Sequence, residues 1–402
     1  MKKFIPFALV LLLAVGSLTS CEKQGAQLYD VKVMAYYDDA SLEADPSGIE
    51  VTIKNTTTGL EETLLTGEKG IATFSLEEGI YSIVASNESD HFVFNGARDN
   101  ITIQPSLNYV AVTLYSSAKS SGLIFKEIYY TGSKTPELTN YYADQFHEIY
   151  NNSDQIAYLD GLCIGVLEPS GSSLSNWVNP DGTIMDRLPV TYHALMFPGD
   201  GDNYPLQPWT STVLAQDAIN HQTDPLGNPA SPVNLGNAPF ETFIEAPGKD
   251  TDAPAAANMI VMYTTAASMY DWLHSVFGSA VIIFRIPTGT DYESFVNDPR
   301  NFMTRPGSTS STKYFMVDKD WVLDAVEICN PDPTKQNKRL PVTLDAGKVS
   351  STGTYISKSI RRKVAQVTGG HTVYKDTNNS TNDFVTNWTP TPFIHPAVVD
   401  TK

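Results

Sequence analysis

The stretch "GIATFSLEEGIYSIVAS", residues 70–86, carries the clearest structural signal in the chain. Apolar and polar side chains alternate on both sides of a central "EEG", and such alternation is typical of strands that bury one face. The apolar positions are mainly Ile71, Phe74, Leu76, Ile80, Ile83 and Ala85. The stretch therefore predicts two β-strands, and "EEG" predicts the turn of a hairpin between them.

Short runs of the same kind extend along the chain in both directions. "YDVKVMAYY" (29–37) and "GIEVTIKN" (48–55) precede the stretch, and further runs bounded by Gly, Asn, Asp or Pro follow it. The 402 residues include 25 prolines, 26 glycines and 20 tyrosines, which suits many short strands and turns. We expect an all-β protein, and its length allows two or three domains.

The first 119 residues contain a resemblance to a known module. Residues 70–86 fit the pattern G-x-A-x-F-x-L-x-x-G-x-Y-x-I-x-A, which resembles the carboxypeptidase regulatory-like, transthyretin-type β-sandwich. The resemblance covers residues 29–119 and implies a non-catalytic spacer at the start of an envelope protein. "SSAKSSG" (116–122) has the composition of a linker, so we expect a second domain over residues 120–402.

The second domain begins with two stretches that resemble a lamin-tail domain, an immunoglobulin-like β-sandwich. These are "GLIFKEIYYTG" (122–132) and "DQFHEIYNNSDQIAYLDGLCIG" (144–165). Later stretches look like further strands and the closing turn of that sandwich: residues 197–216, 278–289, 320–330, 358–363 and 375–384. The resemblance implies two tandem immunoglobulin-like or transthyretin-like sandwiches.

His147 and Glu148 stand side by side in the second of these stretches. Neighbouring side chains of a strand point to opposite faces, so the two cannot form one catalytic dyad. We expect Glu148 instead to hold the following "NNSD" turn through backbone hydrogen bonds.

Residues 217–277 are longer than an ordinary lamin-tail domain would hold, and we interpret them as an insertion. Within and just beyond it, "AAANMIVMYTTAASMYDWLHSVFG" (255–278) predicts a helix, because Met269, Leu273 and Val276 recur at spacings of four and three. His274 lies beside this apolar face, and we expect it to be a packed histidine rather than a ligand.

The chain begins with the layout of a secretory signal. Lys2 and Lys3 precede an apolar run, and small residues precede Cys21. The run is shorter than the roughly 20 apolar residues of a spanning helix. "LTSC" (18–21) resembles the lipobox of bacterial lipoproteins, which implies a signal peptide over 1–20, an acylated Cys21 and a lipidated tether over 21–28. A soluble secreted protein is the alternative.

The charge balance and the remaining cysteines narrow the chemistry further. Removal of residues 1–20 takes away two lysines, so 25 basic residues face 45 acidic ones and the net charge is near −20. A chain this acidic repels nucleic acid, so we expect no nucleic-acid partner.

The other two cysteines, Cys163 and Cys329, lie in apolar runs. They are either two buried free thiols or, since an exported protein permits one, a disulfide.

Two glycine-bearing loops place carboxylates at alternate positions. "GDGDN" (199–203) contains Asp200 and Asp202, and "GKDTD" (248–252) contains Asp250 and Asp252. Alternate oxygen donors in a sharply turning loop suit calcium, here at Asp200 and Asp202, although the last glutamate of an EF-hand loop is missing. Solvated turns are the alternative.

Aromatic rings on loops often anchor a ligand, and three tryptophans lie in polar or proline-bearing surroundings. These are Trp177, Trp209 and Trp388, whereas Trp272 and Trp321 are expected in the core. We expect a ligand or partner to contact the insertion together with Trp209, Asp200, Asp202, Asp250 and Asp252.

Signal, lipobox and both modules together resemble a family of Bacteroidota lipoproteins of unknown function. The resemblance implies a non-catalytic binding or docking protein, lipid-anchored at the outer membrane, on the cell surface or its periplasmic face. The implied partner is a TonB-dependent receptor barrel in nutrient uptake. No GxSxG motif or Cys–His pairing favours an enzyme. The alternatives are a glycan-active surface hydrolase that uses dispersed carboxylates and a purely structural envelope protein.

Overall fold

The computed structural model describes residues 27–38, 45–89, 92–118, 122–245 and 250–400. It is 42% strand and 6% helix, so the predicted all-β fold is confirmed. The signal peptide, Cys21 and residues 119–121 of the predicted linker lie outside the described residues. Residues 116–118, also predicted as linker, instead belong to a strand that ends at Ala118. In the described part of the chain, no helix is both long and apolar enough to cross a membrane.

The N-terminal strands form one sheet that folds over a core. Its order is β3-β2-β5-β6-β7-β1-β4. The strands are β1 (Tyr29–Tyr37), β2 (Glu50–Asn55), β3 (Glu61–Leu65), β4 (Ile71–Leu76), β5 (Gly79–Glu88), β6 (Phe92–Ile103) and β7 (Tyr109–Ala118). The first half of β7 runs parallel to β1 and its second half antiparallel to β6, so β7 joins the two layers. Val33, Phe74, Ile83 and Val112 are buried between them.

The predicted hairpin in residues 70–86 is wrong, although both of its strands exist. β4 pairs with β1, whereas β5 pairs with β2 and β6. The "EEG" segment therefore carries the chain from one layer to the other. Alternation specifies which face of a strand is buried, but it does not specify the neighbouring strand.

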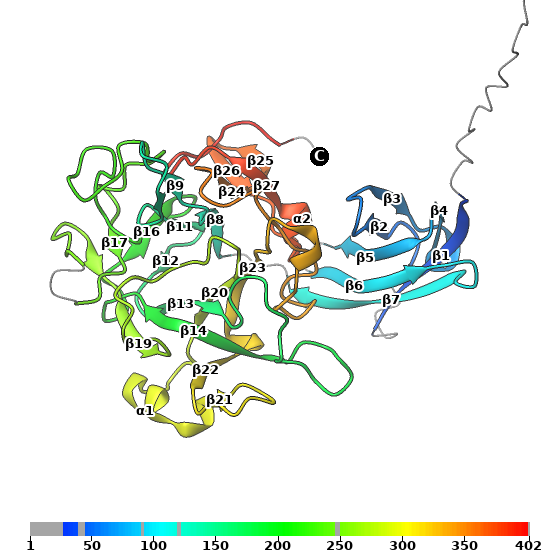
Figure 1. Ribbon diagram of the computed structural model, residues 1–402, viewed down its shortest axis with the longest axis horizontal. Helices are drawn as coiled ribbons and strands as arrows, with labels where there is room; N and C mark the ends of the chain where they lie inside the picture. Colours follow the sequence, from blue (N-terminus) through cyan, green and yellow to red (C-terminus); the bar gives the residue numbers. More distant parts are fainter. Residues whose placement is uncertain (1–26, 39–44, 90–91, 119–121, 246–249, 401–402) are drawn as a thin grey trace, which may run out of the picture.

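Beside three two-stranded pairs, two larger sheets build the C-terminal part, each with seven strands like the N-terminal sheet (Figure 1). The first has the order β18-β17-β16-β11-β8-β24-β27, and the second has β21-β22-β14-β13-β20-β23 with β19 beside β14. The first comprises β8 (Leu123–Tyr129), β11 (Phe146–Asn151), β16 (Ser211–Ala215), β17 (Phe240–Glu241), β18 (Ala257–Asn258), β24 (Ser359–Arg362) and β27 (Phe384–Trp388). The second comprises β13 (Leu162–Leu167), β14 (Arg187–Met196), β19 (Ile260–Thr264), β20 (Ala280–Arg285), β21 (Phe302–Thr304), β22 (Lys313–Asp318) and β23 (Val322–Glu327).

Three short pairs complete the described strands: β9 (Ser133–Lys134) with β10 (Asn140–Tyr141), β12 (Ala157–Tyr158) with β15 (Pro205–Leu206), and β25 (Val364–Thr368) with β26 (His371–Tyr374). The described α-helices are α1 (Tyr292–Asn297) and α2 (Ser380–Asp383). Short 3₁₀ turns lie at Glu68–Gly70, Pro299–Asn301, Lys319–Trp321 and Pro333–Lys335.

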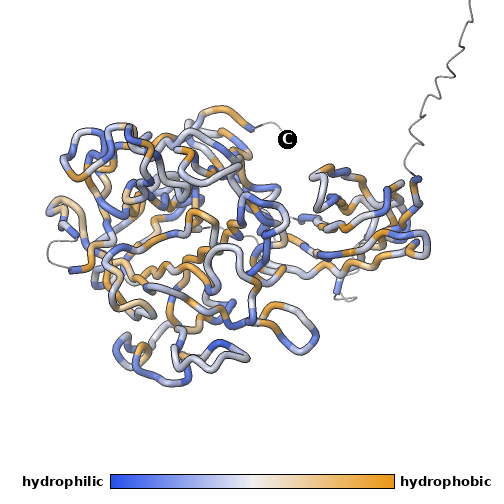
Figure 2. The backbone as a smooth tube through the Cα atoms, in the orientation of Figure 1, coloured by the Kyte–Doolittle hydropathy of each residue, from blue (hydrophilic) through white to orange (hydrophobic). Residues whose placement is uncertain are grey.

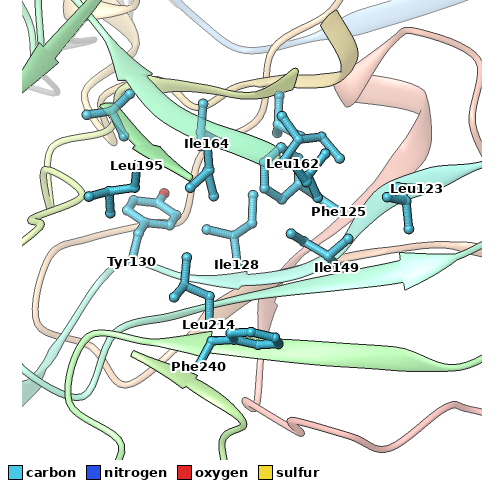
Figure 3. Packing of buried hydrophobic residues seen from close by; sticks show 14 of the residues in the cluster. Leu123, Phe125, Ile128, Tyr130, Ile149, Leu162, Ile164, Leu195, Leu214 and Phe240 are labelled. Carbon is cyan, nitrogen blue, oxygen red and sulfur yellow. The ribbon is translucent and has the colours of Figure 1, made fainter. Parts of the chain in front are cut away.

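The main core lies between the two larger sheets. Phe125, Ile128 and Ile149 from the first sheet meet Leu162 and Ile164 from the second (Figure 3). The opposite face of the second sheet buries Phe284 and Phe315 in a separate cluster. This sheet is covered on both faces, so its central strands β13 and β20 consist almost entirely of apolar residues. Figure 2 shows such apolar segments in the interior of the C-terminal part.

The helix predicted over residues 255–278 is wrong. Residues 257–258 form β18 and residues 260–264 form β19, which pairs antiparallel with β14. The β-branched Ile260, Val261 and Thr264 favour a strand, and the open side of β14 supplies its partner. Beyond β19 the chain is irregular and buries Trp272 in the main core, so the apolar spacing reflects burial rather than helical periodicity.

Residues 217–277, the predicted insertion, form more than a surface loop. Asn228, Ser231 and Leu235 are buried, and Leu235 packs with Tyr129 and Phe146 of the first sheet. Removal of this part of the insertion would therefore expose the core beneath it.

The N-terminal sheet contacts the C-terminal part directly. Asn95 Nδ2 donates to the Thr377 carbonyl at 2.8 Å, and Ser117 Oγ donates to the Thr343 carbonyl at 2.9 Å. A pocket of about 280 Å³ lies between the two parts, with Lys54 on one wall and Lys348 on the other.

Candidate functional site

His147 and Glu148 point away from each other, as predicted. His147 Nε2 lies 3.1 Å from His274 Nδ1, and its ring lies 4.8 Å from that of Trp272. The Glu148 carboxylate instead accepts hydrogen bonds from Lys126 Nζ at 2.9 Å and from Ser211 Oγ at 2.6 Å. The two side chains therefore serve separate buried networks.

The prediction that Glu148 holds the "NNSD" turn is wrong. Asn151 itself organises that turn, since its Nδ2 donates to the Gln155 carbonyl at 2.7 Å and its Oδ1 accepts from Ser153 Oγ at 2.7 Å. Glu148 is fully buried, so it needs a counter-charge, and Lys126 supplies one.

A β-bulge brings Lys126 to this carboxylate. Glu148 lies opposite Glu127, and Ile149 lies opposite Phe125, so Lys126 is the extra residue of β8. Lys126 Nζ binds Glu127 at 3.1 Å and the Thr391 carbonyl at 3.1 Å. One buried cation thus serves two carboxylates. Burial raises the pKa of Glu148 to about 7, although Lys126 opposes the shift.

His147 and His274 form a buried neutral pair. The Ser279 carbonyl lies 3.0 Å from His274 Nε2 and can only accept, so Nε2 donates and neutral His274 must accept at Nδ1. His147 Nε2 is then the donor of their shared bond. Burial lowers the pKa of His274 to about 3, and burial together with His274 lowers that of His147. This confirms His274 as a packed histidine.

The pair predicts a loss of stability in acid. An unfolded histidine titrates near pH 6.5, whereas folded His274 stays neutral far below it, so its contribution is present above pH 6.5 and is lost as the pH falls. From pH 7 to pH 5 we expect wild type to lose about 2 kcal/mol relative to His274→Gln in urea unfolding. Between pH 7 and 8 the difference should stay constant, and a constant difference down to pH 5 would contradict the argument.

The "GDGDN" loop is organised by a residue outside it. Asp160 accepts from the backbone N–H groups of Tyr204 at 2.8 Å, Asn203 at 2.9 Å and Gly201 at 3.1 Å. Burial opposes ionisation of Asp160, but these bonds outweigh it and lower its pKa. Asp200 and Asp202 are exposed. Calcium binding there stays a prediction, and no group of three acidic, His or Cys ligands in the described chain includes either residue.

A different carboxylate group lies in the insertion. One carboxylate oxygen each from Asp217, Asp250 and Asp271 lies within 4.8 Å of the others, and all three residues are partly buried. Asp252 is not among them, and its Oδ1 accepts from Asn258 Nδ2 at 2.8 Å. Asp250 was predicted from the sequence as a residue that contacts a ligand or partner. Asp217 and Asp271 belong to no motif and were not predicted.

Burial and mutual repulsion disfavour ionisation of this group. Burial is the largest cause for each residue. Neighbouring acids are the second cause for Asp217 and Asp271, whereas backbone hydrogen bonds from Ile244 and Thr251 partly offset the shift of Asp250. The pKa of Asp217 rises to about 8 and that of Asp271 to about 6, and that of Asp250 is also raised. The group therefore favours any positive species, whether a proton or a metal cation.

Comparison with known proteins identifies the family. A family model described as a protein of unknown function (DUF4876) matches residues 207–391. The crystal structure of a DUF4876 family protein from Bacteroides thetaiotaomicron is 30% identical, covers 92% of this chain and 98% of its own, and has a TM-score of 0.62. This chain belongs to the DUF4876 family. This membership confirms the expectation that the chain belongs to a family of unknown function. No curated protein matches the chain.

The tryptophans of this DUF4876 protein do not form one surface. Trp177 lies outside the strands, as expected, but it is buried against Tyr314 instead of exposed. Trp209 stacks on His371 with ring centroids 4.9 Å apart and an interplanar angle of 2°. Trp209 precedes β16 and Asp217 follows it, so the two lie beyond opposite ends of a five-residue strand that is itself roughly 13 Å long at about 3.3 Å per residue. The structure thus separates Trp209 from the insertion carboxylates.

Two further tryptophans and the two described cysteines of the DUF4876 chain pack against other parts of the protein. Arg361 lies 4.2 Å from the ring centre of Trp388, and Trp321 packs partly buried on the second core. Cys163 and Cys329 are buried free thiols, which decides against a disulfide between them. Burial raises the pKa of each to about 12, so neither is a reactive thiolate.

Proposed function

We propose that the protein is a lipid-anchored, non-catalytic binding or docking component of the outer membrane, accessory to a TonB-dependent receptor. The "LTSC" lipobox supports the anchor. Similarity to a Bacteroides protein over nearly the whole chain supports the bacterial context. We further propose residues 29–119 as a carboxypeptidase regulatory-like spacer and residues 120–402 as a lamin-tail-like scaffold.

The main observation behind the proposal is that buried charged side chains pair with one another inside the protein. Lys126 binds Glu148, Arg339 binds Glu327 at 3.2 Å, and both pairs are inaccessible to solvent. Charges used in this way stabilise a rigid scaffold instead of facing a substrate. A rigid scaffold that displays loops is the usual architecture of binding proteins.

The anchor predicts a simple fractionation result. Cys21→Ser removes the acylated sulfur, so we expect the full chain to leave the membrane fraction and appear in the soluble fraction. Cys163→Ala is the matched control, because that thiol is buried in β13 and should leave the protein membrane-bound. If Cys21→Ser still pellets after a high-salt wash, the anchor lies elsewhere.

Docking is tested by affinity purification of the tagged protein from solubilised outer membranes. The proposal requires that a β-barrel receptor co-purifies with wild type. Retention of the acylated protein in membranes without any receptor at stoichiometric yield would favour a purely structural envelope role.

A further inference from the structure

Three acidic side chains of the insertion meet although their residues are far apart in the chain. Asp217 follows β16, Asp250 precedes β18 and Asp271 follows β19. Their carboxylate oxygens lie within 4.8 Å of one another. The negative charges of Glu241 and Asp144 also repel the Asp217 carboxylate and raise its pKa. The fold thus gathers like charges that repel, which is unfavourable without a counter-ion.

A buried amide independently indicates that something is missing from this group. The Gln216 side chain is 4% exposed, and its Oε1 has no hydrogen-bond partner among the described residues. Its amide NH₂ faces Asp271, because a hydrogen bond from Gln216 lowers the pKa of that carboxyl group. Buried polar atoms are nearly always satisfied, so the unpaired amide oxygen beside this carboxylate group points to a ligand.

We propose that Asp217, Asp250 and Asp271, together with the amide oxygen of Gln216, form a calcium site. The ion would join three separate segments of the insertion to the end of β16. This site differs from the "GDGDN" loop and does not depend on the proposed anchoring or docking.

The donor set suits calcium better than other common cations. Calcium takes carboxylate, amide and water oxygens at 2.3–2.6 Å, so two oxygens on one ion are at most about 5 Å apart. The separations within 4.8 Å fit this limit. Magnesium requires a tighter octahedron, and zinc prefers nitrogen and sulfur ligands. The three aspartates are only partly buried, which leaves room for water ligands.

The test is calorimetric titration of the chelator-treated full chain with CaCl₂, combined with thermal unfolding in the presence and absence of calcium. We expect binding and a higher melting temperature with calcium. Asp217→Asn and Asp271→Asn should each weaken binding by at least roughly tenfold, because calcium affinity depends on the number of charged ligands. Both should abolish the calcium-induced rise in melting temperature.

The same variants control for folding. Asp271→Asn removes a repulsive charge, and Asp217→Asn replaces an acid that is largely protonated at pH 7 without calcium. Without calcium both variants should therefore melt no lower than wild type. Asp200→Asn is the matched control in the other acidic loop and should bind calcium like wild type. No binding by wild type, or unchanged affinity in both insertion variants, would overturn the proposal. Loss of binding in Asp200→Asn would also overturn it and place the ion in the "GDGDN" loop.

Discussion

Arg362→Met is expected to lower the free energy of unfolding by about 3–5 kcal/mol, because it leaves buried carboxylates without their cation. Arg362 Nη2 lies 2.7 Å from Asp324, and Nη1 lies 2.9 Å from Asp376 and 3.5 Å from Asp383. Its Nε also donates to the Phe125 carbonyl at 2.9 Å. Methionine keeps an unbranched apolar stem but can replace none of these bonds.

The local environment makes this loss large. The arginine side chain is 2% exposed, so water cannot take its place. Burial raises the pKa of Asp324 to about 7 and that of Asp383 to about 6, even though Arg362 opposes both shifts. Asp324 and Asp383 therefore depend on the Arg362 guanidinium to ionise near neutral pH.

Urea unfolding at pH 7 measures the effect of Arg362→Met. Arg300→Met is the matched control, because Arg300 pairs with Asp298 but is 87% exposed, and such surface pairs contribute about 1 kcal/mol or less. If the two variants lose a similar free energy of unfolding, the buried ion pairs of Arg362 do not stabilise the protein more than a surface pair does.

The β-rich character of the protein could be predicted from its sequence because alternation and apolar runs report burial directly. The runs around Phe146, Leu162 and Val281 all became strands of the two larger sheets. Strand partners could not be predicted in the same way. The segment after Leu76 was expected to turn back on itself, yet it crosses to the other layer.

The polar interior was the least predictable part, because each group depends on a partner that is remote in the chain. Arg362 meets Asp324 across 38 positions. Asp217 and Asp271 meet across the whole insertion, and neither belongs to a motif. Sequence spacing predicts contacts only within one helix or strand. Contacts between strands require the topology, which the local pattern leaves open.

The β-bulge at Lys126 illustrates the same limit at one residue. In a regular strand Lys126 and Glu127 would point to opposite faces, and only one could reach Glu148. The bulge allows Lys126 to contact both carboxylates. The resulting network also binds the Thr391 carbonyl and the Phe393 N–H, so it holds the C-terminal segment against the first sheet.

Lys126→Met should therefore destabilise the protein by about 3–5 kcal/mol at pH 8, since it leaves Glu127 and Glu148 buried without their cation. The deficit should depend on pH. The pKa of folded Glu148 is about 7 with the lysine present and must rise when the lysine is removed. An acid whose folded pKa exceeds its unfolded value of about 4.3 loses stabilisation as the pH rises through the folded pKa.

Above pH 7 the wild-type carboxylate is ionised beside Lys126, whereas the Lys126→Met variant must still hold a proton on Glu148 in order to fold. Its deficit should then grow by about 1.4 kcal/mol per pH unit between pH 7 and 9, measured by urea unfolding. Lys54→Met is the control, because Lys54 and Glu61 are 3.3 Å apart but 46% and 49% exposed. That variant should lose about 1 kcal/mol or less at every pH. A pH-independent deficit in Lys126→Met would mean that Glu148 is not the group left uncompensated.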